Sequence, residues 1–350
     1  MKAAVLKSTN NIVFDEIETP EPGEGEVRIK VHYTGICGSD VPRALEGKVH
    51  NFPLVLGHEF SGRIDKVGPG VDEALVGQRV SGIPLIPCME CEDCSEGHYS
   101  LCKTYGFVGS RSDGSMAEYV VVPVSNAYPI GDDVTDLQGA FYEPTTVAIH
   151  GIELAEVKPG SSCIVVGSGT IGVLLAQALR GYGIGNIVVT KRVTTTFGPA
   201  QSVGIENIVA SSEEGWQQKA LDMAGVRGFD YVFDTAGNPS TILHSFEMAG
   251  NRGTVCFVGT PKRDVVFTSK QWELINRKEL KLIGSWMSYS APWPGVEWDR
   301  ADELFANGTI KVTDEMIDSI YPMSKAQEAF QRFQASHGTH GKVIIDSQGV

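Results

Sequence analysis

The feature that most constrains the fold is a glycine-rich turn between an apolar strand and an apolar helix. Residues 163–180 read CIVVGSGTIGVLLAQALR, which contains a G-x-G-x-x-G pattern. In this context the first glycine makes the turn, the second lets the backbone approach a pyrophosphate, and the third lets the helix pack closely on the strand. The segment predicts a doubly wound parallel sheet with a dinucleotide at the helix N-terminus. We expect these residues to bind the dinucleotide: Gly167, Gly169, Thr170, Ile171 and Gly172.

The end of the next expected strand is basic. An NAD site usually carries Asp or Glu about 20 residues after the last glycine, where it binds the ribose 2′-hydroxyl. Here that count reaches Lys191, followed by Arg192 and the hydroxyls of Thr194–Thr196. A 2′-phosphate accepts charge-assisted hydrogen bonds from such groups, so the stretch predicts an NADP site. The alternative is a solvated basic strand end that tolerates either cofactor.

Further strand–turn units follow this one. FDYVFDTAG (229–237), GTVCFVGT (253–260) and ELKLIGSWM (279–287) each carry an apolar strand with a turn after it. We expect the turns to lie along the cofactor, with Gly259 and Ser285 in contact with it.

Four of the seven cysteines lie close together, in CMECEDCSEGHYSLC. Spacings of two residues let thiolates converge on one tetrahedral zinc ion, so we expect a closed structural site. A pair of disulfides is the alternative, which a reducing cytoplasm disfavours. The expected ligands are Cys88, Cys91, Cys94 and Cys102. Cys163 and Cys256 lie in apolar strand-like runs and are expected to be buried free thiols.

A second potential metal site is dispersed along the chain. Cys37 lies in GICGSD, His58 and Glu59 lie in GHEFSG, and Glu143 lies in FYEPTT. Each of these residues taken alone is more often structural. Together they offer a thiolate, an imidazole and a carboxylate, whereas a catalytic zinc needs three protein ligands and one open position.

The pattern G-H-E-x2-G-x5-G-x2-V, from Gly57 to Val71, resembles the zinc signature of the medium-chain dehydrogenase/reductase family. The four-cysteine segment, CGSD and the glutamate before proline fit the family's order along essentially the full chain. The resemblance implies an α/β fold with a mostly-β GroES-like catalytic domain and a Rossmann domain. It also implies an N-terminal catalytic domain, residues 1–150, completed by 286–350, and a nucleotide-binding domain over 151–285.

The same resemblance implies roles for the dispersed residues. Cys37, His58 and Glu143 would hold the catalytic zinc, and Glu59 would be a nearby carboxylate able to approach it. Asp40 would orient His58, and Ser39 would relay the substrate proton.

Three segments bear on the substrate. CGSDVPRAL carries Arg43, FVGSRSDGSMAEY carries Arg111, and IGSWMSYSAPWPGVEW carries Trp286 and is rich in aromatic residues. They resemble members of the family that oxidise sugar-alcohol phosphates, which implies galactitol 1-phosphate oxidised to tagatose 6-phosphate by NADP or NAD. An unphosphorylated polyol, or another phosphate such as arabitol phosphate, is the alternative, with Arg43 and Arg111 as surface ion pairs. A further alternative is a non-catalytic NADPH-binding protein. Such a protein would not need the metal ligands Cys37, His58 and Glu143.

Composition excludes other partners. The formal net charge of −14 disfavours nucleic acid and anionic membranes, and no apolar run reaches the ~18 residues of a membrane span. The N-terminus lacks a long apolar stretch, so we expect a cytoplasmic enzyme with a small-molecule substrate. The family resemblance suggests a homodimer or homotetramer.

Overall fold

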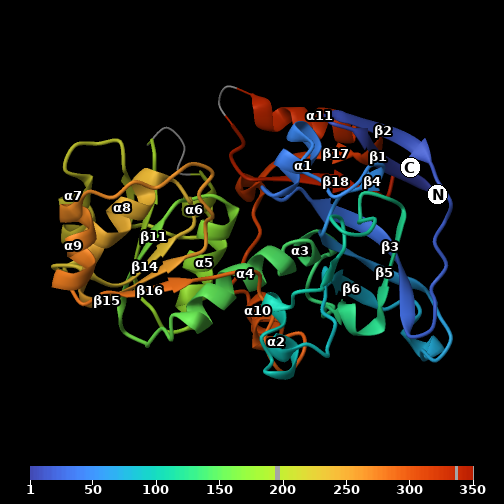
Figure 1. Cartoon of the computed structure of the whole chain (residues 1–350), viewed down its shortest axis with the longest axis horizontal. Coiled ribbons are helices and arrows are strands. Elements are labelled where there is room, and N and C mark those ends of the chain that lie inside the picture. The colour runs from blue at the N-terminus through green and yellow to red at the C-terminus, as the bar shows by residue number, and fades with distance from the viewer. Residues whose placement is uncertain (194–197, 336–337, 350) are drawn as a thin grey trace. The chain divides into compact units, whose positions relative to one another are not determined.

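A computed structural model describes residues 1–193, 198–335 and 338–349 (Figure 1). The predicted contribution of Thr194–Thr196 to the cofactor site lies outside these residues. The chain divides into two compact units. Unit 1 comprises Met1–Glu143, Tyr289–Asp302 and the C-terminal segment from Ile317, and unit 2 comprises Pro144–Ser288 and Glu303–Met316.

The core of unit 2 is a parallel sheet with the strand order β13-β12-β11-β14-β15-β16. Its strands are β11 (Ser162–Val166), β12 (Asn186–Lys191), β13 (Ile208–Ala210), β14 (Phe229–Asp234), β15 (Ala249–Phe257) and β16 (Lys281–Gly284). The residues of β11 are all buried, as expected for a strand covered on both faces. The order reverses on either side of β11, which confirms the predicted doubly wound sheet.

Helices cover this sheet (Figure 1). They are α5 (Thr170–Gly181), α6 (Gly198–Ser202), α7 (Trp216–Ala224), α8 (Pro239–Met248) and α9 (Ser269–Arg277). One apolar core joins the strands to α7, α8 and α9, with Trp216 and Phe246 among its largest side chains. Helix α5 packs on β11 and β12 and is buried from Gly172 to Leu179. This packing fixes the position of the loop that joins the C-terminal end of β11 to α5.

Unit 1 is mostly β. Its main sheet has the order β10-β6-β5-β3-β18-β17, with β9 also paired to β3, and a smaller sheet has the order β2-β1-β4. The strands are β1 (Lys2–Ser8), β2 (Asn11–Glu16), β3 (Glu26–Gly35), β4 (Leu54–Val55), β5 (Glu59–Val67), β6 (Arg79–Gly82), β9 (Tyr119–Pro123), β10 (Ala127–Pro129), β17 (Ile317–Pro322) and β18 (Lys342–Asp346). A short pair, β7 (Leu85–Ile86) with β8 (Gly106–Phe107), flanks the four-cysteine segment.

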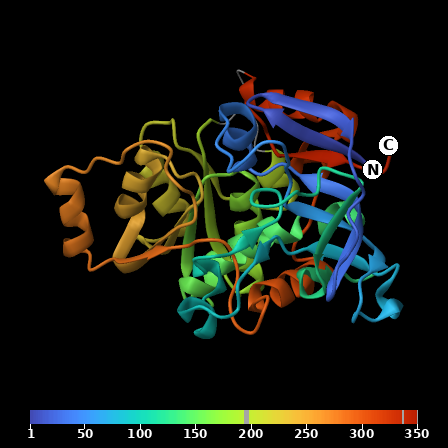
Figure 2. The same ribbon diagram turned by 45° about the vertical axis from the view of Figure 1, so that its right-hand side comes forward.

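The C-terminal segment completes unit 1, and its red ribbon lies beside the blue N-terminal strands in Figure 2. Strand β18 pairs antiparallel with β3, and Phe330 of α11 (Ala326–Gln331) packs with Leu6 and Leu54 from the N-terminal strands. Further helices of the chain are α1 (Asp40–Glu46), α2 (Glu92–Ser95), α3 (Asp136–Gly139), α4 (Tyr142–Leu154) and α10 (Val296–Ala306). Residues more than three hundred positions apart thus share one apolar core.

The two units do not coincide with the predicted domain limits. The division falls between Glu143 and Pro144, near the start of α4, whereas the prediction placed it at residue 150. Glu303–Met316 belongs to unit 2, since Gln177 of α5 hydrogen-bonds Lys311 in both directions. In the described part of the chain no helix is long and apolar enough to cross a membrane.

Candidate active site and cofactor loop

Metal-ligating side chains gather where β3 ends and β5 begins. Cys37 follows β3, His58 precedes β5, and Glu59, the first residue of β5, pairs with Gly35 of β3. The ligand atoms of Cys37, His58 and Glu59 all lie within 4.8 Å of one another. A thiolate, an imidazole and a carboxylate at this spacing suit a zinc ion. The pairing of β3 with β5 therefore brings the dispersed ligand residues together.

Glu143, the predicted third ligand, is the second residue of α4 and is buried. Burial raises the pKa of Glu143 to about 7, and the charges of His58 and Glu59 also act on it. Glu143 therefore lies near the cluster, although the group within 4.8 Å contains Glu59 in its place. A bound cation would oppose the effect of burial, because it favours the ionised carboxylate. The ligand role of Glu143 stays a prediction.

Asp40 is fully buried beside the cluster, at the start of α1. Its carboxylate lies 3.3 Å from His58 Nδ1 and accepts hydrogen bonds from the Cys37 amide at 3.2 Å and from Arg43 Nη1 at 3.0 Å. Burial opposes ionisation, but the charges of His58 and Arg43 outweigh it and lower the pKa of Asp40. Because Nδ1 of His58 faces Asp40, Nε2 is the nitrogen available to a metal.

Ser39 carries the hydroxyl predicted to relay a proton. Its Oγ donates to Cys37 Sγ at 3.3 Å and accepts from Arg43 Nη1 at 2.9 Å. Arg43 thus forms an ion pair with Asp40 and also contacts Ser39, partners that the sequence did not reveal. The ion-pair alternative for Arg43 therefore has structural support, while its role toward a phosphate stays a prediction.

Aromatic rings connect Arg111 to the cluster. The guanidinium of Arg111 lies 4.4 Å from the centre of the Tyr105 ring, Tyr105 meets Phe107 edge-on at 6.4 Å, and Phe107 meets His58 at 5.4 Å. Stacking occupies the face of a guanidinium and leaves its N–H edge for an anion. Phe107 is a neighbour of the cluster that sequence reasoning missed, since nothing in its short strand, β8, distinguishes it from a core residue.

The tryptophan-rich segment divides between the two units. Trp286, expected to contact the substrate, lies in unit 2 and is 54% exposed. The rings of Tyr289, Trp293 and Trp298 lie in unit 1 instead, where Tyr289 stacks on Trp293 at 5.6 Å and Trp293 meets Tyr99 at 5.3 Å. Most of this aromatic segment therefore packs residues 289–302 against the four-cysteine lobe, residues 88–102.

Lys342 is a second residue that the sequence analysis missed. It is the first residue of β18 and is buried, and its Nζ lies 2.8 and 2.6 Å from the two carboxylate oxygens of Glu59. Burial would lower the pKa of Lys342, but the charges of Glu59 and Cys37 outweigh it and raise the pKa. A lysine at the start of the apolar strand KVIID gives no signal of such a role.

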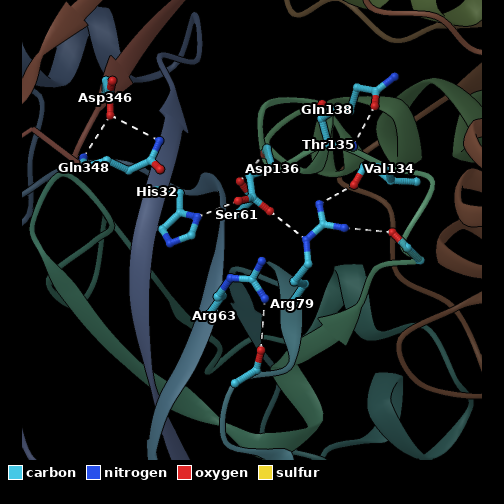
Figure 3. Close-up of polar contacts among 12 residues, drawn as sticks. His32, Ser61, Arg63, Arg79, Val134, Thr135, Asp136, Gln138, Asp346 and Gln348 are labelled. Carbon is cyan, nitrogen blue, oxygen red and sulfur yellow. Dashed lines mark hydrogen bonds and ion pairs between the residues drawn. The ribbon is translucent and has the colours of Figure 1, made fainter.

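Asp136, the first residue of α3, connects that helix to strands β3, β5 and β6 (Figure 3). Its carboxylate lies 2.7 Å from His32 Nδ1 and accepts from Arg79 Nε at 2.8 Å, and its backbone carbonyl accepts from Ser61 Oγ. Only two residues separate α3 from α4, and the second of them, Phe141, donates its N–H to the carbonyl of Gln138. This network therefore fixes the start of the helix that carries Glu143.

The four-cysteine lobe brings its predicted ligands together. The four sulfur atoms lie within 4.8 Å of one another, with Cys88 Sγ 4.0 Å from Cys94 Sγ and 3.5 Å from Cys102 Sγ. Sulfurs at the corners of a tetrahedron with Zn–S bonds of about 2.3 Å are about 3.8 Å apart, so the arrangement fits zinc. All seven cysteines are described and carry free thiols, which argues against the disulfide alternative.

The glycine loop has the shape that a pyrophosphate requires. Gly167 has φ 118°, in the region that favours glycine, and a Cβ on Gly172 would lie 2.0 Å from the carbonyl oxygen of Gly167. A Cβ on Gly169, the N-cap of α5, would meet nothing within 4 Å. Close helix–strand packing at Gly172 and open space at Gly169 fit the predicted dinucleotide loop, with Thr170 and Ile171 in the first turn of α5.

The predicted cofactor residues beyond the loop lie at the ends of strands. Lys191 ends β12 and is partly buried, which lowers its pKa, while Arg192 after it is exposed. Gly259 donates its N–H to the Asp234 carbonyl, and Ser285 donates its N–H to Phe257. The Oγ of Ser285 is buried without a hydrogen-bond partner in the described residues. A cofactor group would supply such a partner.

Comparisons with known proteins agree with this geometry. Residues 23–132 match the alcohol dehydrogenase GroES-like domain, and residues 170–303 match the zinc-binding dehydrogenase domain. Galactitol 1-phosphate 5-dehydrogenase of Escherichia coli is 37% identical, over 98% of this chain and 99% of the relative. Sorbitol dehydrogenase of Bacillus subtilis is 29% identical, over 95% and 93%. The crystal structure of galactitol-1-phosphate dehydrogenase from E. coli superposes with a TM-score of 0.93 at 36% identity, covering 99% of this chain and all of that one.

The chain belongs to the zinc-dependent alcohol dehydrogenases of the medium-chain dehydrogenase/reductase family. The predicted family and the predicted combination of a GroES-like domain with a Rossmann sheet are confirmed.

Proposed function

We propose that the chain oxidises a sugar-alcohol phosphate, galactitol 1-phosphate to tagatose 6-phosphate, with NADP preferred over NAD. The observation that carries the chemistry is the cluster of Cys37, His58 and a carboxylate with the Ser39 hydroxyl 3.3 Å from Cys37 Sγ. The substrate rests on the 37% identity to a galactitol 1-phosphate dehydrogenase across nearly the whole chain. The second metal, at the four cysteines, would stabilise its lobe only.

Each residue of the cluster has a proposed role. Cys37, His58 and Glu143 hold a zinc ion, which when bound polarises the substrate hydroxyl and lowers its pKa. Asp40 fixes the ring of His58 and favours its metal-binding tautomer. Ser39 Oγ would relay the hydroxyl proton, accepting it as it passes its own proton on to solvent, and Arg43 holds that Oγ in place. The substrate carbon becomes a carbonyl as its hydride leaves for the nicotinamide.

The cofactor preference rests on charge. Lys191 stands where NAD enzymes of this fold usually carry an acid, and Arg192 follows it. Two cations attract a 2′-phosphate, and no carboxylate is present at that position to repel it. A site that tolerates both cofactors remains the alternative.

The phosphate of the substrate needs a cation. Arg43 and Arg111 are the candidates, and Trp286 would pack against the sugar chain. An unphosphorylated polyol is the alternative substrate, as for the sorbitol dehydrogenase relative. Arabitol phosphate is a further alternative substrate. We also propose that the protein forms a homodimer or a homotetramer, as its resemblance to the family suggests.

A substrate screen tests the proposal. The purified protein is assayed with galactitol 1-phosphate, arabitol phosphate, galactitol and sorbitol, each with NADP and with NAD. The proposal predicts the highest kcat/KM for galactitol 1-phosphate with NADP. A higher value for sorbitol or galactitol would favour the unphosphorylated alternative. Cofactor binding without turnover on any alcohol would favour a non-catalytic NADPH-binding protein.

A further inference from the structure

The short stretch after β16 carries the predicted cofactor residue Ser285 and contains a strained backbone. Met287 has φ 57°, in the left-handed region that glycine adopts freely and other residues adopt at a cost in free energy. Such conformations persist where the surrounding structure holds them, and they gather at functional sites. The strain at Met287 therefore raises the question of what holds it.

Other left-handed residues of the described chain have a local reason for their conformation. Asn10 turns the chain between β1 and β2, and Arg252 lies where the register of β15 is irregular. Glu156 and Glu279 follow the ends of α4 and α9. Met287 lies at no helix end, hairpin or strand irregularity.

Side chains and backbone groups of other elements hold the residues on both sides of Met287. Before it, Ser285 donates its N–H to the carbonyl of Phe257 at 2.9 Å. After it, Ser288 Oγ lies 2.8 Å from Oγ1 of Thr146 on α4, and both side chains are fully buried.

The next residue, Tyr289, is held by one serine of the four-cysteine lobe. Ser100 Oγ accepts a hydrogen bond from the Tyr289 N–H at 3.0 Å and donates one to the Tyr289 carbonyl at 3.3 Å, and both residues are buried. The lobe also lies against Ala291, because a Cβ on Gly97 would lie 2.5 Å from Ala291 Cβ. The left-handed turn at Met287 is thus closed between two fixed points.

The order of the strands places Ser285 on the nicotinamide side of the expected cofactor. A dinucleotide crosses a doubly wound sheet where the strand order reverses, with one nucleotide on each side. Lys191 at the end of β12 marks the adenosine side, whereas Ser285 follows β16 on the other side. The Oγ of Ser285 is buried without a hydrogen-bond partner among the described residues, and a Cβ on Gly151 of α4 would lie 3.8 Å from it.

We propose that Met287 is a positioning residue: its left-handed turn, held by Ser100 and Thr146, keeps Ser285 in place for the nicotinamide half of the dinucleotide. This rests on the proposed function, which assigns a dinucleotide to this sheet. A residue that is ordered during folding loses less conformational entropy when the ligand binds, so the held turn strengthens cofactor binding.

Cofactor binding to the full-length protein tests this, with a whole dinucleotide and a fragment that lacks the nicotinamide. The probes are NADPH and 2′-phospho-ADP-ribose, each titrated by calorimetry. NADH and ADP-ribose replace them if the wild type binds NADH more tightly, since the adenosine end does not enter the prediction. We expect Met287→Gly to bind the dinucleotide about two- to fivefold more weakly, which is the effect of the additional freedom of one glycine, and to bind the fragment as the wild type does.

Two observations separate positioning from a general defect. The unfolding midpoint of Met287→Gly should stay close to that of the wild type, since relief of strain offsets the greater freedom of the unfolded chain. Arg252→Gly is the matched control, because Arg252 has φ 62° and lies in the first half of β15, away from the end that faces the cofactor. It should bind both ligands as the wild type does.

Ser100→Ala removes the hydrogen bonds to Tyr289 and leaves Met287 intact. We expect it to weaken binding of the dinucleotide by about two- to tenfold, the value of one hydrogen bond, and to spare the fragment. Wild-type affinity of Met287→Gly for the dinucleotide would overturn the positioning role. So would equal weakening of both ligands in either variant, which would indicate a structural role only. A wild type that binds both ligands but oxidises no alcohol would overturn the proposed function and leave the positioning role standing.

Discussion

Arg43 donates a hydrogen bond at 3.0 Å to Asp40, whose carboxylate is completely buried. The same nitrogen lies 2.9 Å from Ser39 Oγ. Arg43 therefore supports both the residue that orients His58 and the hydroxyl that we assign to proton transfer. A phosphate-binding role would come in addition to these contacts.

Substitution of the two arginines should separate these roles. We expect Arg43→Ala to lower kcat/KM roughly tenfold on phosphorylated and unphosphorylated polyols alike, because a charge-assisted hydrogen bond contributes about 1.5–3 kcal/mol. Arg111→Ala should weaken only the phosphorylated substrate, by a similar factor. Steady-state kinetics of both variants on galactitol 1-phosphate and galactitol check this. An effect of Arg43→Ala confined to the phosphorylated substrate would instead assign the phosphate to Arg43.

The glycines of the cofactor loop should respond differently to alanine. A Cβ at Gly172 would lie 2.0 Å from the Gly167 carbonyl, so Gly172→Ala should lower the free energy of unfolding by about 1–3 kcal/mol, as overpacking does. Gly169→Ala has open space and should fold normally, yet bind the dinucleotide more weakly, because the methyl group would occupy the pyrophosphate's approach. Denaturant unfolding and cofactor titration of each variant measure the two effects. Equal stability loss in both variants would contradict the assignment.

Lys191→Asp should reverse the cofactor preference. The wild type should favour NADP in kcat/KM by about 5- to 150-fold, which is 1–3 kcal/mol from one or two charged contacts. The new carboxylate would repel the 2′-phosphate and accept a bond from the free ribose hydroxyl. Partial reversal is expected if Arg192 holds the phosphate by itself. Lys270→Asp, an exposed charge change on α9, is the control and should leave the ratio unchanged. A wild type that favours NAD would show that Lys191 and Arg192 serve solvation only.

Cys91→Ala should loosen the four-cysteine lobe without touching the catalytic cluster. A structural zinc contributes directly to folding, so loss of one ligand should expose residues 88–102 to proteases. Cys163→Ala removes a buried thiol outside both clusters and should keep the lobe resistant. Limited proteolysis with mapping of the cleavage sites distinguishes them. Equal resistance in Cys91→Ala would mean that packing of Tyr99 on Trp293 holds the lobe without a metal.

The sequence predicted what spacing and local periodicity determine. Gly167 to Gly172 form a loop within one strand–turn–helix unit, and the four cysteines lie within one short segment, so each site could be inferred before the fold was known. Cys37 and His58 could be paired only through the family resemblance. The register of β3 against β5, which unites them, depends on the whole sheet.

Features that depend on distant contacts escaped prediction. Lys342 reaches Glu59 across β3 because Gly35 leaves room, a relationship among three strands that no local pattern encodes. Tyr289 and Trp293 lie in the aromatic segment that was expected to bear on the substrate, yet they pack on the four-cysteine lobe, since aromatic composition does not indicate which surface a ring covers. The boundary between the units, at Glu143 and Pro144, falls within helix α4. It therefore depends on how the rest of the chain packs and not on a break in the local sequence pattern.

Metal content and turnover of Cys37→Ala test the central claim most directly. The wild type should contain two zinc ions per chain and Cys37→Ala one, because the thiolate supplies one of only three protein ligands at the open site. The variant should keep its four-cysteine ion and its unfolding midpoint, yet lose nearly all oxidation of galactitol 1-phosphate. Elemental analysis and an NADP-reduction assay on the same samples decide the matter. Two ions retained in Cys37→Ala, or turnover equal to the wild type, would contradict the account.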